Sequence, residues 1–163
     1  MACSPAENCS TTIFVDFRCR DLRLAVPLES VRRAYPAALP RPVPGSPAAL
    51  LGVLQLENQA VAVLDLAVRA GMPLAPIHPS QQLLLLDLRG FALALLVDAV
   101  GGTVEHKLPR LPPSGEQLLG SNFLKSFLIH EDGLCLVCDP ERFLLDEERR
   151  LLLDSLELDA HAC

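Results

Sequence analysis

Short apolar runs separated by turn-forming residues are the feature that most constrains how this chain folds. The stretch "LLGVLQLENQAVAVLDL", residues 50–66, holds two such runs, Leu51–Leu56 and Ala60–Leu64, on either side of a polar dip. Runs of four to eight apolar and β-branched residues bounded by Gly, Asn and Asp are typical of β-strands. No apolar run approaches the length of about 18 residues that a membrane-spanning helix needs. The pattern predicts a mainly β fold without a membrane span.

Turn signals place the expected hairpins. Asn58 lies between the two runs, and asparagine tolerates the positive φ that a tight turn requires. Residues 13–17 and 22–26 form an earlier pair of runs, and Asp132-Gly133 separates a later pair. Two clusters of strands flank the loop "AGMPLAPIHPSQ". We therefore expect two subdomains, one at about 13–74 joined by the C-terminal segment and one at about 82–139.

Two helices and one extended loop complete the expected elements. The apolar spacing in "LESVRRAY" predicts a short helix that Pro36 ends. The proline-rich stretch 36–47 suits an extended surface loop because proline lacks the donor that a sheet requires. Pro140 begins a predicted amphipathic C-terminal helix, with acids early and arginines later. Residues 1–12 and 154–163 are expected to be tails that flank a single domain at 13–153.

Composition narrows the classes of partner. The net charge is −6, and the chain has one Tyr and no Trp, which argues against the basic, ring-lined surfaces that bind nucleic acid. The first twelve residues lack the basic start and apolar stretch of a signal peptide, so we expect a cytoplasmic protein. The six cysteines are scattered, and free thiols are the expectation.

Cysteine and histidine patterns offer little for a metal site. Cys135 and Cys138 have the spacing of half a zinc site, but residues three apart in a strand point to opposite faces. Cys135 with His130 lacks a third orienting group for thiol catalysis. We expect buried structural cysteines and no metal. The histidines are dispersed along the chain, at positions His78, His106, His130 and His161.

Two further patterns are explained by turns. Asp65 and Asp98 each end an apolar run. The two residues could form a carboxylate pair for acid–base chemistry, or each could be a turn former. A role in turns is the simpler explanation of both aspartates. Gly101-Gly102 lacks the spacing and the following helix of a phosphate loop. We expect no catalytic residue and no cofactor.

Five pieces in order, "FRC…LAVPLESV", "PGSP…LLGVLQL", "VAVLDL", "FALALLVDAVGG" and "DGLCLVCDPERFL", resemble the CheW-like adaptor domain of bacterial chemosensory arrays. The resemblance runs from about residue 13 to about residue 153. It implies two small five-stranded β-barrels packed around a shared core and closed by the C-terminal helix. It also implies a noncatalytic adaptor that links chemoreceptor tips to the regulatory domain of a CheA-type histidine kinase and contacts other CheW-like proteins.

The resemblance also implies a partner-binding surface, with one reversal of charge. Where the family commonly has a glutamate this chain has Arg33, and where the family's hairpin has an arginine it has Glu57. If the two side chains face each other, the ion pair is kept with inverted polarity; otherwise both are solvated surface charges. A partner selected for the usual signs would meet like charges at an inverted pair. An inverted pair therefore predicts that this chain has its own set of partners, in an alternative pathway. The expected partner-binding residues are Val31, Arg33, Gly52, Val53, Leu54, Glu57 and Asn58.

A second class of function stays open, a small enzyme or ligand-binding protein with a site between the two barrels. An enzyme should show a concave pocket with convergent titratable groups, whereas an adaptor should show an exposed groove without them.

Overall fold

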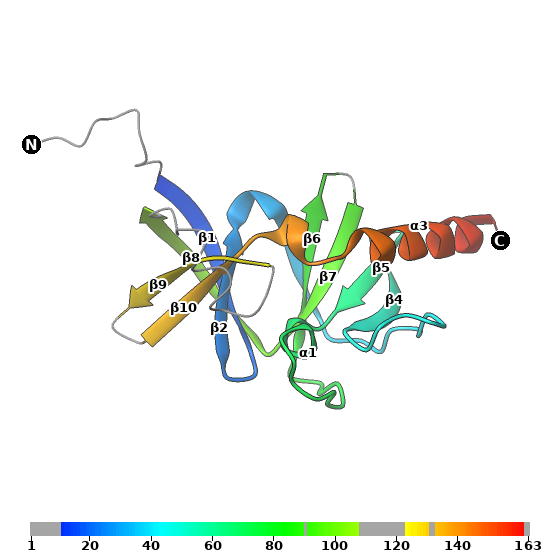
Figure 1. The fold of residues 1–163 in the computed structure, drawn as a ribbon, viewed down its shortest axis with the longest axis horizontal. Helices are drawn as coiled ribbons and strands as arrows, with labels where there is room; N and C mark the ends of the chain where they lie inside the picture. Colours follow the sequence, from blue (N-terminus) through cyan, green and yellow to red (C-terminus); the bar gives the residue numbers. More distant parts are fainter. Residues whose placement is uncertain (1–10, 90, 108–122, 131–132, 162–163) are drawn as a thin grey trace, which may run out of the picture.

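The computed structural model describes residues 11–89, 91–107, 123–130 and 133–161, and its strands form two five-stranded sheets (Figure 1). The first sheet has the order β8-β1-β2-β10-β9 and the second has the order β3-β6-β7-β5-β4. The strands are β1 (Thr11–Cys19), β2 (Leu22–Pro27), β3 (Val31–Pro36), β4 (Leu50–Leu56), β5 (Gln59–Leu64), β6 (Gln82–Leu88), β7 (Phe91–Val97), β8 (Ala99–Lys107), β9 (Leu124–His130) and β10 (Gly133–Cys138).

The mainly β architecture with two five-stranded units is confirmed, but the sheets are open rather than closed barrels. No pairing joins β8 to β9, or β3 to β4, among the residues that the structure describes. The loop that connects β3 to β4 adds a bridge between Arg41 and Val53 of β4.

The division of the chain between the sheets corrects the expected split near residue 74. Strands β3 to β7, within residues 31–97, build the whole second sheet, while β1 and β2 join β8 to β10 in the first. The pairing of β1 with β8 and the parallel pairing of β2 with β10 cause this arrangement. Local turn signals cannot reveal these pairs because their strands are far apart in the chain.

The β4–β5 hairpin forms as the sequence predicts. Leu56 pairs with Gln59, which leaves Glu57 and Asn58 as a two-residue turn with φ of 51° and 62°. Positive φ at both central residues matches the right-handed twist of the flanking strands. This geometry directs the Glu57 side chain from the tip of the hairpin toward β3.

The expected helix in "LESVRRAY" is wrong. Only Leu28–Ser30 forms a single 3-10 turn, η1, and Val31–Pro36 is strand β3, paired antiparallel with β6. Strand β3 is mostly exposed, so its pairing with β6, together with packing of Tyr35 on the core of the second sheet, outweighs a weak helical preference. The loop 37–49 is mostly exposed, as its prolines predict.

The buried apolar residues of the described strands form three clusters, of which one joins the two sheets. The largest lies between the two sheets and includes Phe17, Leu64 and Leu95. A second lies within the second sheet, around Val63 and Leu85, and a third lies within the first sheet, around Phe14. Both sheets therefore contribute one face to a shared core, which fixes their relative placement.

The C-terminal segment is divided differently from the expected single helix. Pro140–Arg142 forms a 3-10 turn, η2, and α3 runs from Asp146 to His161, so most of the expected tail 154–163 is helical. Figure 1 shows α3 running past the second sheet, toward the edge where β5 and β4 lie. The short helix α1 (Leu66–Arg69) follows β5, and Arg69 contacts Glu148 of α3. No described helix is long and apolar enough to cross a membrane.

Candidate functional site

Two of the expected partner-binding residues, Arg33 and Glu57, meet where β3 approaches the β4–β5 turn. Tyr35 donates a hydrogen bond from its hydroxyl to Oε1 of Glu57 at 2.5 Å. The Nη2 atom of Arg32 lies 3.4 Å from Oε2, and the Nη1 atom of Arg33 lies 4.0 Å from Oε1. The structure therefore brings Arg33 and Glu57 to the distance limit of an ion pair, with Arg32 closer. We call Arg32, Arg33, Tyr35 and Glu57 the β3–hairpin cluster.

Hydrogen bonding and charge fix the protonation of this cluster. The Tyr35 hydrogen bond lowers the pKa of Glu57 below its ordinary value, assisted by the charges of Arg32 and Arg33 and opposed by desolvation. The same hydrogen bond, with smaller contributions from desolvation and the Glu57 charge, raises the pKa of Tyr35. One carboxylate serves two guanidiniums, and the Arg33 side chain is 68% exposed. The cluster thus presents a net positive charge to solvent.

A β-bulge explains why two adjacent arginines reach one carboxylate. The β3–β6 register shifts between Val31 and Arg33, so Arg32 is an extra residue in the ladder. A bulge disrupts strict alternation and re-aims a side chain. A helical interpretation of this segment does not predict that Arg32 and Tyr35 contact Glu57. A period-two interpretation would have placed Arg33 and Tyr35 on one face, and Tyr35 is the single tyrosine of the chain.

Most of the remaining expected site residues pack within the fold. Gly52 is buried with φ of 147°, and a Cβ atom there would overlap the carbonyl oxygen of Arg41. Val31 and Val53 pack against the shared core, and Leu54 packs against the core of the second sheet. Asn58 is exposed at the hairpin tip. Of the seven expected residues, Arg33, Glu57 and Asn58 are the ones that face solvent.

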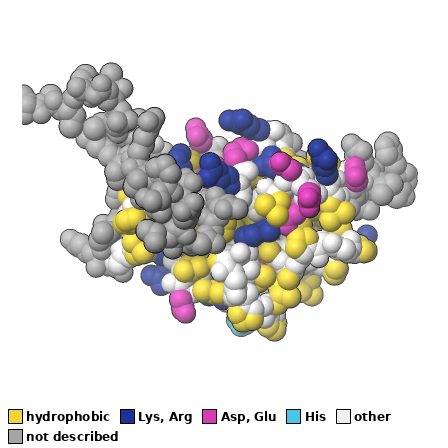
Figure 2. Space-filling model, viewed as in Figure 1, with side chains coloured by type: hydrophobic (Ala, Val, Ile, Leu, Met, Phe, Trp, Pro, Cys, Tyr) yellow, Lys and Arg dark blue, Asp and Glu magenta, His cyan; other side chains and the backbone are white. Residues whose placement is uncertain are grey.

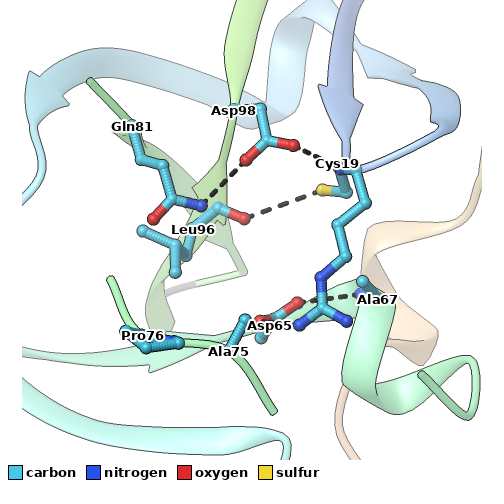
Figure 3. A pocket seen from close by; sticks show the side chains of 9 residues that line it. Cys19, Asp65, Ala67, Ala75, Pro76, Gln81, Leu96 and Asp98 are labelled. Carbon is cyan, nitrogen blue, oxygen red and sulfur yellow. Dashed lines mark hydrogen bonds and ion pairs between the residues drawn. The ribbon is translucent and has the colours of Figure 1, made fainter. Parts of the chain in front are cut away.

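The hollow between the two sheets is small and filled with structural contacts (Figure 3). Its volume is about 20 Å³, close to the room that one water molecule needs. Asp98 accepts hydrogen bonds from the Gln81 side chain at 2.8 Å and from the Arg20 backbone. Asp65 accepts the Ala67 N–H at 2.9 Å, which caps α1. Both carboxylates therefore act in turns and caps, as expected, and nothing here favours a substrate site.

The cysteines of the described strands are buried on different surfaces. Cys135 packs within the first sheet, while Cys138 packs in the shared core, so the two side chains point to opposite faces as strand alternation predicts. Burial raises the pKa of Cys135, Cys138 and Cys19. The Sγ atom of Cys19 donates to the Leu96 carbonyl at 3.6 Å. These thiols are poor nucleophiles.

One histidine side chain, that of His78, lies in the described part of the chain. His78 bonds to Ser80 within its own loop, with 2.7 Å between Nδ1 and Oγ. The side chains of His106, His130 and His161 lie outside the part of the chain that the structure describes. On the face in Figure 2, basic side chains lie beside acidic ones rather than forming a continuous stripe.

Comparisons with known proteins agree on one family. The family model for the CheW-like domain matches residues 14–148. "Probable chemotaxis protein CheW" of Rhizobium etli is 30% identical over 126 residues, which is 76% of this chain and 81% of the relative. "Protein FrzA" of Myxococcus xanthus is 34% identical over 116 residues, 66% of this chain and 71% of the relative.

A solved structure supports the fold. The scaffolding protein TtCheW from Thermoanaerobacter tengcongensis superposes with a TM-score of 0.69, covering 86% of this chain and 93% of that chain. Its sequence identity is 15%, so the likeness concerns architecture.

Proposed function

Because this chain belongs to the CheW-like domain family, we propose that it is a noncatalytic adaptor of a bacterial chemosensory complex. In this role it couples the cytoplasmic tips of chemoreceptors to the regulatory domain of a CheA-type histidine kinase, in the cytoplasm, through protein–protein contacts alone. The Rhizobium etli relative carries the name of a chemotaxis protein, and the solved structure carries that of a scaffolding protein.

The single observation that carries the proposal for this chain is the β3–hairpin cluster. It joins two elements distant in sequence into one exposed, charged surface, and its carboxylate is held from three sides. A preorganised surface of this kind suits recognition of a partner because little side-chain freedom is lost on binding.

The polarity of the cluster supports a dedicated partner set. Arg33 lies on β3 and Glu57 on the hairpin, which reverses the signs that the family commonly has at these two places. A partner selected for the usual signs would meet like charges, which costs several kcal/mol at an interface. We therefore infer that this adaptor serves an alternative chemosensory pathway rather than a standard array.

Affinity purification from the native cell tests the role. The tagged protein should recover a CheA-type kinase and a chemoreceptor, and both should bind the purified protein in a calorimetric titration. Glu57→Arg should weaken at least one of these interactions roughly tenfold or more, because three positive charges then meet. Glu105→Arg, an exposed reversal on β8 of the other sheet, serves as the matched control and should leave both affinities unchanged.

The double variant Arg33→Glu with Glu57→Arg separates specificity from simple loss. It restores a complementary pair with the common polarity, so it should remain folded, lose its native partner and bind a receptor of a standard array more tightly. Recovery of neither partner, together with no binding of purified kinase or receptor, would overturn the adaptor proposal. If both Glu57 variants bind the partners with unchanged affinity, the β3–hairpin cluster is not part of the partner-binding surface.

A further inference from the structure

Two arginines lie directly opposite each other at one end of the first sheet. Arg18 of β1 pairs with Arg23 of β2 in the antiparallel register, so their side chains share one face of the sheet. Like charges directly opposite each other destabilise a strand pair. An arrangement of this kind calls for a counter-ion.

Asp16 supplies that counter-ion to Arg23. Its Oδ2 atom accepts hydrogen bonds from Nη2 at 2.8 Å and from Nε at 3.2 Å of Arg23. Its Oδ1 atom accepts the Gly102 N–H at 2.9 Å. The Asp16 and Arg23 side chains are mostly buried, with 13% and 22% exposed. Both oxygens of Asp16 are therefore occupied.

A bulge in β8 makes room for this carboxylate. The β1–β8 register shifts between Asp16 and Phe17, which leaves Gly101 as the extra residue opposite Asp16. A Cβ atom on Gly101 would overlap Oδ1 of Asp16. The absence of a side chain at Gly101 thus allows the Asp16 carboxylate to reach the Gly102 backbone and hold Arg23 in place.

Among the residues that the structure describes, none supplies a counter-ion to Arg18. Its side chain is exposed and makes no ion pair or hydrogen bond with any residue in the described ranges. It borders a hollow of about 170 Å³ lined by Asp16, Phe17, Arg18, Arg23, Ala99 and Gly101. Pockets for drug-sized ligands measure about 300–1,000 Å³, so this hollow suits a smaller group such as the end of one side chain.

We propose that this hollow binds the carboxylate of a glutamate or aspartate side chain from a partner protein, with Arg18 as the anchor and Arg23 beside it. Arg18 carries one positive charge that no described residue neutralises, which a monoanion balances and a phosphate dianion exceeds. Guanidinium groups match a carboxylate with paired donors. Only the source of the carboxylate, a partner protein, rests on the adaptor function proposed above.

A titration of the purified chain tests the site. The probe is N-acetylglutamate α-amide, which carries one side-chain carboxylate, and N-acetylglutamine α-amide is its neutral counterpart. The Gly102 amide and the Arg18 Nε–H are followed by NMR at constant ionic strength. We expect saturable shifts in the millimolar range with the glutamate probe and none with the glutamine probe.

Two variants test whether the probe binds at Arg18. Arg18→Gln should weaken binding of the glutamate probe at least tenfold, and Arg89→Gln, at an arginine 88% exposed on the β6–β7 turn, should leave it unchanged. Shifts that do not saturate, that persist in Arg18→Gln or that the glutamine probe also produces would overturn the site. Tighter binding of inorganic phosphate than of the glutamate probe would overturn its assignment to a carboxylate.

The protein source of the carboxylate is tested separately. Arg18→Glu should lower the affinity for at least one purified partner at least tenfold, whereas Arg89→Glu should not. Unchanged affinity for every partner, with a positive titration, shows that the source is wrong while the site stands. Because the titration needs neither receptor nor kinase, its outcome and that of the adaptor proposal are distinguishable.

Discussion

Removal of the Glu148 carboxylate is expected to destabilise the attachment of α3 to the second sheet. The Nη2 atom of Arg69 lies 2.8 Å from Oε1 and 2.7 Å from Oε2 of Glu148, and the Leu145 N–H donates to Oε1 at 2.8 Å. The side chains are 6% exposed for Glu148 and 20% for Arg69. Glu148→Ala therefore removes a buried pair and a helix cap together.

The magnitude follows from this geometry. Breaking a buried pair by removing one partner costs about 3–5 kcal/mol. Here a single Arg69 nitrogen, Nη2, contacts both carboxylate oxygens of Glu148. The Nε atom of Arg69 is buried and has no hydrogen-bond partner among described residues. We therefore take the low end of this range of free energy. We expect a loss of about 3 kcal/mol, or roughly 6–12 °C in melting temperature for a domain of this size.

Chemical and thermal unfolding followed by circular dichroism measure this loss. Glu147→Ala, an exposed acid in the same helical turn, is the matched control and should change stability by less than about 0.5 kcal/mol. Arg69→Met with Glu148→Met should recover most of the loss, because apolar side chains replace a buried ion pair at little cost. A loss below about 1 kcal/mol in Glu148→Ala, or a double variant as unstable as the single, would refute the reasoning.

Three further outcomes are expected. Glu57→Gln should lower the pKa of Tyr35 toward its ordinary value, because the hydrogen bond that raises it is weakened, and absorbance titration of the single tyrosine reads this directly; an unchanged midpoint contradicts the contact. Gly52→Ala should cost about 1–3 kcal/mol in urea unfolding, whereas Gly102→Ala, which has open space, should cost less. Cys135 should resist alkylation at neutral pH in the native protein and react at higher pH, because its raised pKa keeps the reactive thiolate scarce at neutral pH. Mass-spectrometric mapping of the alkylated residues, with a urea-unfolded control, checks this.

Local patterns predicted the hairpins but not the sheets. The turn at Glu57 and Asn58 follows from residues adjacent in sequence, and the structure has it where the pattern places it. The β2–β10 pairing depends on segments more than a hundred residues apart, and no turn signal encodes it. For the same reason the local pattern indicates a helix where the structure has β3, because the strand forms through its pairing with β6.

The candidate site was predictable in part for a similar reason. Arg33 and Glu57 were found through their resemblance to a family pattern, and the structure brings them within 4.0 Å. Tyr35 and Arg32 were missed because a helical interpretation gives the wrong side-chain periodicity and a bulge has no sequence signal of its own. The Arg18 hollow also depends on a bulge, in β8, and on a pairing between β1 and β2 that sets two arginines opposite each other.

The two proposed surfaces lie on different sheets, and the way the chain connects those sheets bears on scaffolding. The chain begins in the first sheet, builds the whole second sheet and returns, so the two sheets are joined by covalent links at β2–β3 and β7–β8 and by one shared core. Separating them would expose that core and its buried apolar side chains, such as Leu64 and Leu95. A partner held at Arg18 and another held at the β3–hairpin cluster are thereby kept at a fixed separation. In the adaptor role proposed above, that fixed separation between two partners is the contribution that the fold makes to the assembly.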